Sequence, residues 1–131
     1  MPSIAPPPAP FVLVVEDDAT LREVLVEVLR AKGYRARGAK DGGIALCIMA
    51  LERPAAVVLD LVMPVRDGWA VRREMLRDAE LRDVPVIIAS AVEVPSRGLA
   101  ALHVAAALAK PFRHTDLIAA VERALRARKA A

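Results

Sequence analysis

The sequence predicts an α/β domain in which helices cover both faces of a doubly wound parallel sheet. Short, uninterrupted apolar runs alternate along the chain with longer stretches in which apolar residues recur at helical spacing. Strands that are apolar at every position are typical of parallel sheets buried on both faces. Hydrophobic residues make up 56% of the chain and aromatic residues only 3%, so aliphatic side chains must fill the core. These observations together favour repeated βα units.

Five segments are predicted to form the strands of this sheet. Four of them are continuous apolar runs, and the remaining one, over Tyr34–Arg37, is the least distinct. Short apolar runs that are bounded by polar or turn residues indicate strands. The four clear runs are Phe11–Val15, Ala55–Leu59, Val84–Ala89 and Val104–Ala109.

The stretches that separate or follow the strands are predicted to be helices. The first has the clearest apolar stripe, and Gly33 follows it as a helix-ending glycine would. Five strands alternating with five helices, joined by right-handed crossovers, favour a flavodoxin-like (βα)5 fold with strand order 2-1-3-4-5. The predicted helices are Thr20–Lys32, Gly43–Glu52, Trp69–Asp78, Ser96–Leu102 and Thr115–Arg128.

The length of 131 residues suits one domain with its own hydrophobic core. Residues 1–10 contain five prolines and are predicted to form a disordered arm. Residues 11–128 are expected to form the folded domain, and residues 129–131 a tail too short for an additional output domain. The domain is therefore expected to act alone or in trans.

The composition argues against several classes of protein. No apolar run approaches the roughly 20 residues of a membrane-spanning helix, and residues 1–10 lack the pattern of a signal peptide. The single cysteine, Cys47, cannot form an internal disulfide and is predicted to be buried as a small packing residue. A cytoplasmic protein is expected. The net charge of +3 is only a weak indication of nucleic-acid binding.

Polar residues that could carry chemistry follow several of the predicted strands. Glu16 and Asp17 come after the first strand and Asp60 after the third, and in the predicted order these strands are neighbours. Crowded carboxylates at one sheet edge require a cation, and oxygen ligands of this kind suit Mg²⁺. Ser90 and Lys110 follow the fourth and fifth strands. A carboxylate, a cation, an ammonium and a hydroxyl are what phosphoryl transfer to an aspartate needs.

Four motifs occur in an order that resembles the response-regulator receiver family of two-component phosphorelay systems. They are VLVVEDD (residues 12–18), VVLDLVMPVRDGW (57–69), IIASA (87–91) and AKPF (109–112). The resemblance implies a phosphoprotein in signal transduction and not an enzyme with a separate substrate. A sensor histidine kinase or phosphotransfer protein would be the phosphoryl donor, and an unknown downstream protein the output partner.

The resemblance also implies the roles of individual residues. Asp60 would be the phosphoacceptor, and Mg²⁺ would bind Glu16, Asp17, Asp60 and the backbone carbonyl of Val62. Ser90 would be the switch hydroxyl, and Lys110 would pair with Asp60 or its phosphate. The Lys110–Pro111 bond is expected to be cis. Two further expectations are that Gly68 adopts a positive φ and that Asp18 caps a helix.

The sequence departs from the family pattern in three places. Ala107 stands where many receivers carry an aromatic residue, and His103–Val104 where a Gly-Ala pair is common. Apolar Val62 and Val92 occupy positions at which polar side chains help an attacking water, so slow autodephosphorylation is expected.

Three other functions remain open at this stage. A phosphorylation-independent receiver-like scaffold is favoured by Ala107. A hydrolase would need an Asp at the position of Val62. A nucleic-acid-binding protein would use the basic residues Arg126, Arg128 and Lys129.

Overall fold

The structure is a computed structural model that describes residues 9–63, 67–91 and 96–130. Most of the predicted arm, together with Pro64 and Val92, lies outside the described residues. Strands and helices alternate strictly along the described chain. The strands are β1 (Phe11–Val15), β2 (Arg35–Ala39), β3 (Ala56–Leu59), β4 (Val86–Ser90) and β5 (Ala106–Ala109). The helices are α1 (Ala19–Ala31), α2 (Gly42–Leu51), α3 (Gly68–Arg77), α4 (Ser96–Leu102) and α5 (His114–Ala130).

The five strands form one parallel sheet in the order β2-β1-β3-β4-β5, as the sequence predicts. Val15, the last residue of β1, lies opposite Leu59, the last residue of β3. The carboxyl ends of these two central strands are therefore level. In a doubly wound sheet this is the point where the chain reverses its direction of winding and where ligands bind.

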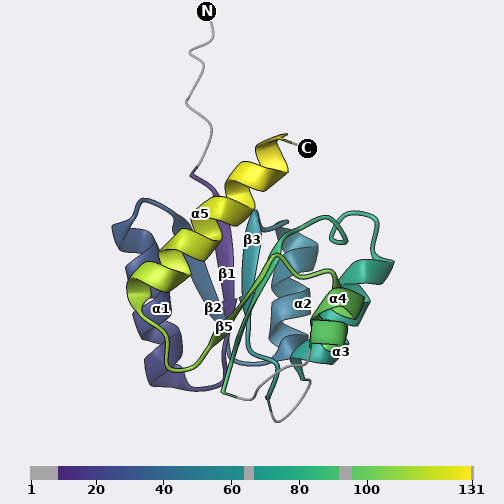
Figure 1. Cartoon of the computed structure of the whole chain (residues 1–131), viewed down its shortest axis with the longest axis horizontal. Helices are drawn as coiled ribbons and strands as arrows, with labels where there is room; N and C mark the ends of the chain where they lie inside the picture. The colour runs from purple at the N-terminus through teal and green to yellow at the C-terminus, as the bar shows by residue number, and fades with distance from the viewer. Residues whose placement is uncertain (1–8, 64–66, 92–95, 131) are drawn as a thin grey trace, which may run out of the picture.

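Helices cover both faces of the sheet, with α1 and α5 on one side and α2, α3 and α4 on the other (Figure 1). Successive residues of β1 point to opposite faces, and every residue of this strand is buried. Leu13 and Val15 join the core beneath α2 and α3, while Val12 and Val14 join the core beneath α1 and α5. Burial on both faces explains why β1, β3 and β4, which are buried at every residue, contain apolar runs without alternation.

Strand boundaries differ from the sequence prediction by up to two residues in β2, β4 and β5. Strand β2 covers Arg35–Ala39 in place of Tyr34–Arg37, and β4 and β5 begin two residues later than predicted, at Val86 and Ala106. Val84 is nevertheless fully buried, in a turn where its amide N–H donates to the carbonyl of Leu81 (3.1 Å). An apolar residue that enters the core from a turn looks the same in the sequence as one in a strand, which is why the run appeared longer.

The helix termini agree with their local sequence. The carboxylates of Asp18, Asp41 and Asp67 accept backbone N–H groups at the starts of α1, α2 and α3 (2.8–3.0 Å). Gly33 adopts φ +93° after α1, which confirms its predicted role. Cys47, in contrast, is exposed, so its predicted burial is wrong. Over the ranges that the structure covers, no helix is both long and apolar enough to cross a bilayer.

Candidate functional site

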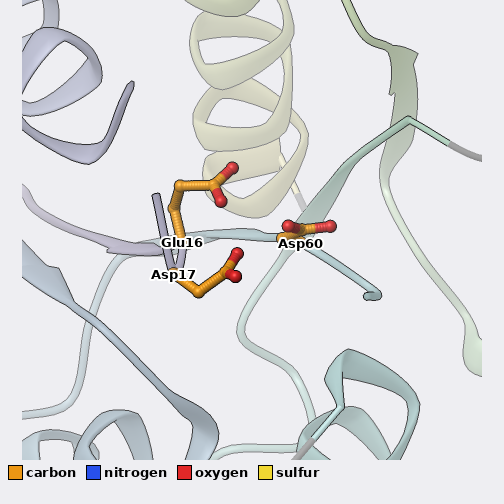
Figure 2. A group of neighbouring side chains, drawn as sticks. All are labelled: Glu16, Asp17 and Asp60. Atoms are coloured by element: carbon orange, nitrogen blue, oxygen red, sulfur yellow. The ribbon is translucent and has the colours of Figure 1, made fainter. Parts of the chain in front are cut away.

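The acidic side chains of the candidate site are delivered by the two central strands. The amide N–H of Asp60, directly after β3, donates to the carbonyl of Val15 at the end of β1 (3.0 Å). The next residue of the β1 chain, Glu16, donates its amide N–H to Ala39 of β2 (3.0 Å). Figure 2 shows the side chains of Glu16, Asp17 and Asp60 gathered at this edge of the sheet.

The three carboxylates form a cluster with a strongly uneven exposure. One oxygen from each of Glu16, Asp17 and Asp60 lies within 4.8 Å of the other two. Glu16 and Asp60 are buried, with 2% and 5% of their surface exposed, whereas Asp17 is exposed. An all-oxygen donor set that is open to solvent on one side suits a hard divalent cation with water ligands, so these residues fit Mg²⁺.

Lys110 brings a positive charge into this cluster from the end of β5. Its Nζ donates to Oδ2 of Asp60 at 3.3 Å and makes a second, shorter ion pair with Oε1 of Glu16. Its own amide N–H bonds to the carbonyl of Ser90 (2.9 Å), which holds the end of β5 against β4. The Lys110–Pro111 peptide bond is cis, as the resemblance implied.

The electrostatics show that the cluster favours positive charge. Burial raises the pKa of Glu16, and the ion pair with Lys110 only partly opposes this shift. Burial alone would lower the pKa of Lys110, but hydrogen bonding to Glu16 and the charges of Asp60 and Glu16 raise it overall. The pKa values of Glu16 and Lys110 are therefore both raised, so each group favours its protonated form. One ammonium among three carboxylates leaves a negative charge that a metal ion could balance.

Two further predicted site residues are Ser90 and Val62. Ser90 ends β4, the strand next to β3, and is buried. The amide N–H of Val62 donates to Oδ1 of Asp60 (3.1 Å), and 56% of the surface of Val62 is exposed. An apolar side chain is thus exposed to solvent beside Asp60. The ligand role of the Val62 carbonyl and the switch role of Ser90 stay predictions.

A glycine is required at position 68 for a different reason from the one predicted. It has no positive φ, so that expectation is wrong. A Cβ atom at this position would lie 2.3 Å from the carbonyl oxygen of Asp60 and 2.8 Å from Cα of Leu61. The Gly68 amide also donates to the carbonyl of Leu61 (3.0 Å). Glycine is required here because the start of α3 lies close to the backbone of Asp60 and Leu61, and not because of its own backbone conformation.

Two arginines make contacts that the sequence did not predict: Arg22 lies beside the acidic pair, and Arg72 lies near the amino ends of β4 and β5, away from the site. Arg22 in α1 donates to the carbonyls of Glu16 and Asp17. Arg72 in α3 is buried and donates to the carbonyls of Leu102, the last residue of α4, and His103, which follows it. Each occupies an ordinary helical position, so its own residue type gives no signal. Gly38 directly follows the predicted strand Tyr34–Arg37 and lies inside β2 of the structure, where its backbone is approached closely by Arg22.

Comparison with known proteins identifies the family to which this chain is related. The sequence profile of the response regulator receiver domain matches residues 12–122. The chain is 38% identical over 117 residues to the response regulator MprA of Mycolicibacterium vanbaalenii, which covers 88% of this chain and 50% of that protein. It is 37% identical over 117 residues to the probable transcriptional regulator ycf27 of Porphyridium aerugineum. This chain therefore spans about half the length of the curated relatives it matches.

Solved structures agree with this assignment. The signal receiver domain of a histidine kinase from Syntrophus aciditrophicus superimposes with a TM-score of 0.82 at 29% identity, over 91% of this chain and 92% of that one. A putative response regulator from Chloroflexus aurantiacus gives a TM-score of 0.83 at 28% identity, over 90% and 98%. Receiver domains are signalling modules that accept a phosphoryl group and bind Mg²⁺ at an acidic pocket. With four motifs, the fold and the acidic cluster in agreement, this chain belongs to the response regulator receiver family.

Proposed function

We propose that this protein accepts a phosphoryl group on Asp60 from a histidine kinase or phosphotransfer protein in a Mg²⁺-dependent reaction. Phosphorylation would then change its affinity for a downstream protein in the cytoplasm. The observation that supports this most directly is the meeting of three carboxylates and one ammonium at the carboxyl ends of β1, β3 and β5.

Asp60 is the nucleophile in this proposal. One carboxylate oxygen forms the new bond to phosphorus, while the bond from phosphorus to the donor breaks and its electron pair leaves with the donor. Lys110, with its Nζ 3.3 Å from Oδ2 of Asp60, would offset the negative charge that spreads over the transferring group. The hydroxyl of Ser90 would donate to a phosphoryl oxygen after transfer.

The metal ligands would be Glu16, Asp17, Asp60 and the carbonyl of Val62. Bound Mg²⁺ would supply further charge neutralisation at the transferring group. The exposed valine at position 62 offers no acid or base to a second substrate or to water. This supports a long-lived phosphoryl group over the turnover of a hydrolase.

The experiment is intact mass spectrometry after incubation with Mg²⁺ and acetyl phosphate. The wild type should gain one phosphoryl group, whereas Asp60→Asn and chelation by EDTA should each abolish the gain. Asp83→Asn is the matched control, because Asp83 is an exposed aspartate outside the cluster, and it should be phosphorylated normally. A folded wild type that gains no mass, or a gain that survives Asp60→Asn, would refute the proposal.

A phosphorylation-independent scaffold is the second candidate, and one observation favours it. Ala107 is small and exposed on β5, so no buried ring is available there to transmit a change at Asp60. If a partner identified by capture on the purified protein binds Asp60→Asn and phosphorylated wild type equally, the scaffold function is the better account.

A further inference from the structure

We infer that Arg22 positions the acidic pair Glu16 and Asp17 for binding a divalent cation, and that Gly38 provides the space it needs. This inference rests on the proposed function. Nη1 of Arg22 donates to the carbonyl oxygen of Glu16 at 2.8 Å and to that of Asp17 at 3.4 Å. One guanidinium thus bonds both residues of the pair from the first turns of α1.

Gly38 lies directly beneath the side chain of Arg22. It sits in the interior of β2, opposite Val14 of β1, and its φ is not in the left-handed region. A Cβ atom on Gly38 would lie 2.7 Å from both Cγ and Cδ of Arg22. Glycine weakens a strand, and it is used where another group must approach the backbone closely. Here that group is the stem of Arg22.

The two carbonyl bonds determine where the carboxylate of Asp17 points. They fix the peptide planes on either side of the Asp17 Cα, and with them its backbone dihedrals. Asp17 is exposed, so packing does not hold its side chain as it holds that of Glu16. The residues on either side of Asp17 are held by other hydrogen bonds. The amide N–H of Glu16 donates to the carbonyl of Ala39, and that of Asp18 donates to Oε2 of Glu16 (3.2 Å). Arg22 completes the restraint of this loop.

Arg30 provides an internal comparison in the same helix. Its Nε and Nη2 donate to the carbonyl of Ala36 in β2 at 3.2 and 2.8 Å. Both arginines therefore join α1 to backbone carbonyls by charge-assisted hydrogen bonds. Only the acceptors of Arg22 belong to the acidic pair. If both arginines merely stabilise the fold, their removal should have the same consequences.

The test is calorimetric titration of the metal-free protein with Mg²⁺, together with thermal unfolding of each variant. Arg22→Ala should weaken Mg²⁺ binding about tenfold, the lower end of the effect seen when groups that orient metal ligands are removed. Gly38→Ala should produce a comparable loss although it keeps the guanidinium, because the new methyl group displaces it. Arg30→Ala should lower the unfolding temperature as much as Arg22→Ala does and leave Mg²⁺ affinity unchanged.

A double-mutant cycle tests whether Gly38 affects Mg²⁺ binding only through the side chain of Arg22. Gly38→Ala should cost Mg²⁺ affinity in the wild type and nothing further in Arg22→Ala, since no stem remains to be displaced. Arg22→Lys should restore part of the affinity. In the metal-free protein, the amide resonances of Asp17 and Asp18, which follow the two carbonyls, should shift in Arg22→Ala and not in Arg30→Ala.

The outcomes separate this inference from the proposed function. If the wild type binds Mg²⁺ and is phosphorylated, but Arg22→Ala binds Mg²⁺ equally well, the inference is overturned and the proposed function stands. Additive losses in the double variant would overturn the role of Gly38. A folded wild type that binds no Mg²⁺ would overturn both.

Discussion

The centre of the sheet, formed by β1 and β3, is more deeply buried than its outer edge, formed by β5 and the short helix α4. At the centre, β1 and β3 are buried at every residue, and the acceptor segment contacts β1, α3 and the chain after β5. At the edge, Ala107 and Ala109 of β5 are exposed, and α4 has only seven residues. A buried arginine, Arg72, makes the hydrogen bonds that tie α3 to the turn between α4 and β5.

This difference distinguishes the residues predicted to act in phosphoryl transfer from the exposed side chains of the outer edge, which could pass a change on to a partner. Every residue predicted to act in phosphoryl transfer lies at the carboxyl ends of the strands, and this includes Lys110, which directly follows the edge strand β5. Two departures from the family pattern, Ala107 and His103, lie at the outer edge with exposed side chains, whereas a third, Val62, lies beside Asp60. We therefore expect changes at the edge to alter stability or output while phosphorylation of Asp60 proceeds normally.

The largest effect is expected from Arg72→Met. The guanidinium is 2% exposed and donates to the carbonyls of Leu102 (2.8 Å), His103 (3.1 Å) and Val84 (3.4 Å). Leaving buried carbonyls without donors should lower the free energy of unfolding by about 3 kcal/mol. Urea denaturation measures this, and Arg73→Met, at an exposed neighbour, should change it by less than about 0.5 kcal/mol. Equal losses in the two variants would contradict the role of Arg72.

Gly68→Ala should lower the stability of the protein and slow phosphorylation by displacing the backbone at the end of β3. Its new Cβ would overlap the backbone of Asp60 and Leu61, so we expect a loss of about 2 kcal/mol in the free energy of unfolding. Phosphorylation by acetyl phosphate should also slow, because the acceptor must move. Gly43→Ala, whose Cβ meets only Oδ1 of Asp41 at 3.3 Å, should leave the phosphorylation rate unchanged. An unaltered rate in Gly68→Ala would show that the acceptor tolerates displacement.

A change in pH dependence is expected from Glu16→Gln. Burial raises the pKa of Glu16 in the folded protein, so folding binds a proton. The resulting stabilisation is fully present below the ordinary carboxyl pKa and is lost as pH rises through the raised folded pKa. Without Mg²⁺, the wild type should therefore lose stability over this window relative to Glu16→Gln. Parallel pH profiles of the two urea midpoints in EDTA would contradict this.

His103→Gly should stabilise the outer edge slightly. His103 is exposed and adopts φ +51°, a conformation that costs most side chains about 1 kcal/mol. Relief of this strain, reduced by the greater freedom of glycine in the unfolded chain, should raise the free energy of unfolding by about 0.5 kcal/mol. His103→Ala serves as the control, since it removes the imidazole and keeps the strain. A gain of the same size in both variants would assign the effect to the side chain.

The smallest effect is expected from Ala107→Tyr. Because Ala107 is exposed, a larger side chain can extend into solvent and should change stability by less than about 0.5 kcal/mol. The rate of phosphorylation should equal that of the wild type. A changed rate would break the separation proposed here, because it would show that the edge strand communicates with Asp60 through its side chain at this position.

Much of the fold followed from local pattern. Four apolar runs, one less distinct segment and five helical stretches were enough to give the strand order, because parallel sheets with helical crossovers allow few arrangements. Asp18 and Gly33 were identified from residue type alone, since helix termini require a side-chain acceptor and a left-handed residue. Strand boundaries were less accurate because buried turn residues such as Val84 look like strand residues.

The sequence by itself determined which residue types reach the carboxyl edge of the sheet: the acidic pair, Asp60, Ser90 and Lys110. Only the tertiary structure decided which atoms meet there, such as Nζ of Lys110 with both Glu16 and Asp60. It also decided that Arg72 is buried, that Arg22 passes over Gly38 and that Gly68 abuts the acceptor. The physical reason is that these contacts join segments distant in sequence, and their distances depend on how whole helices pack against the sheet.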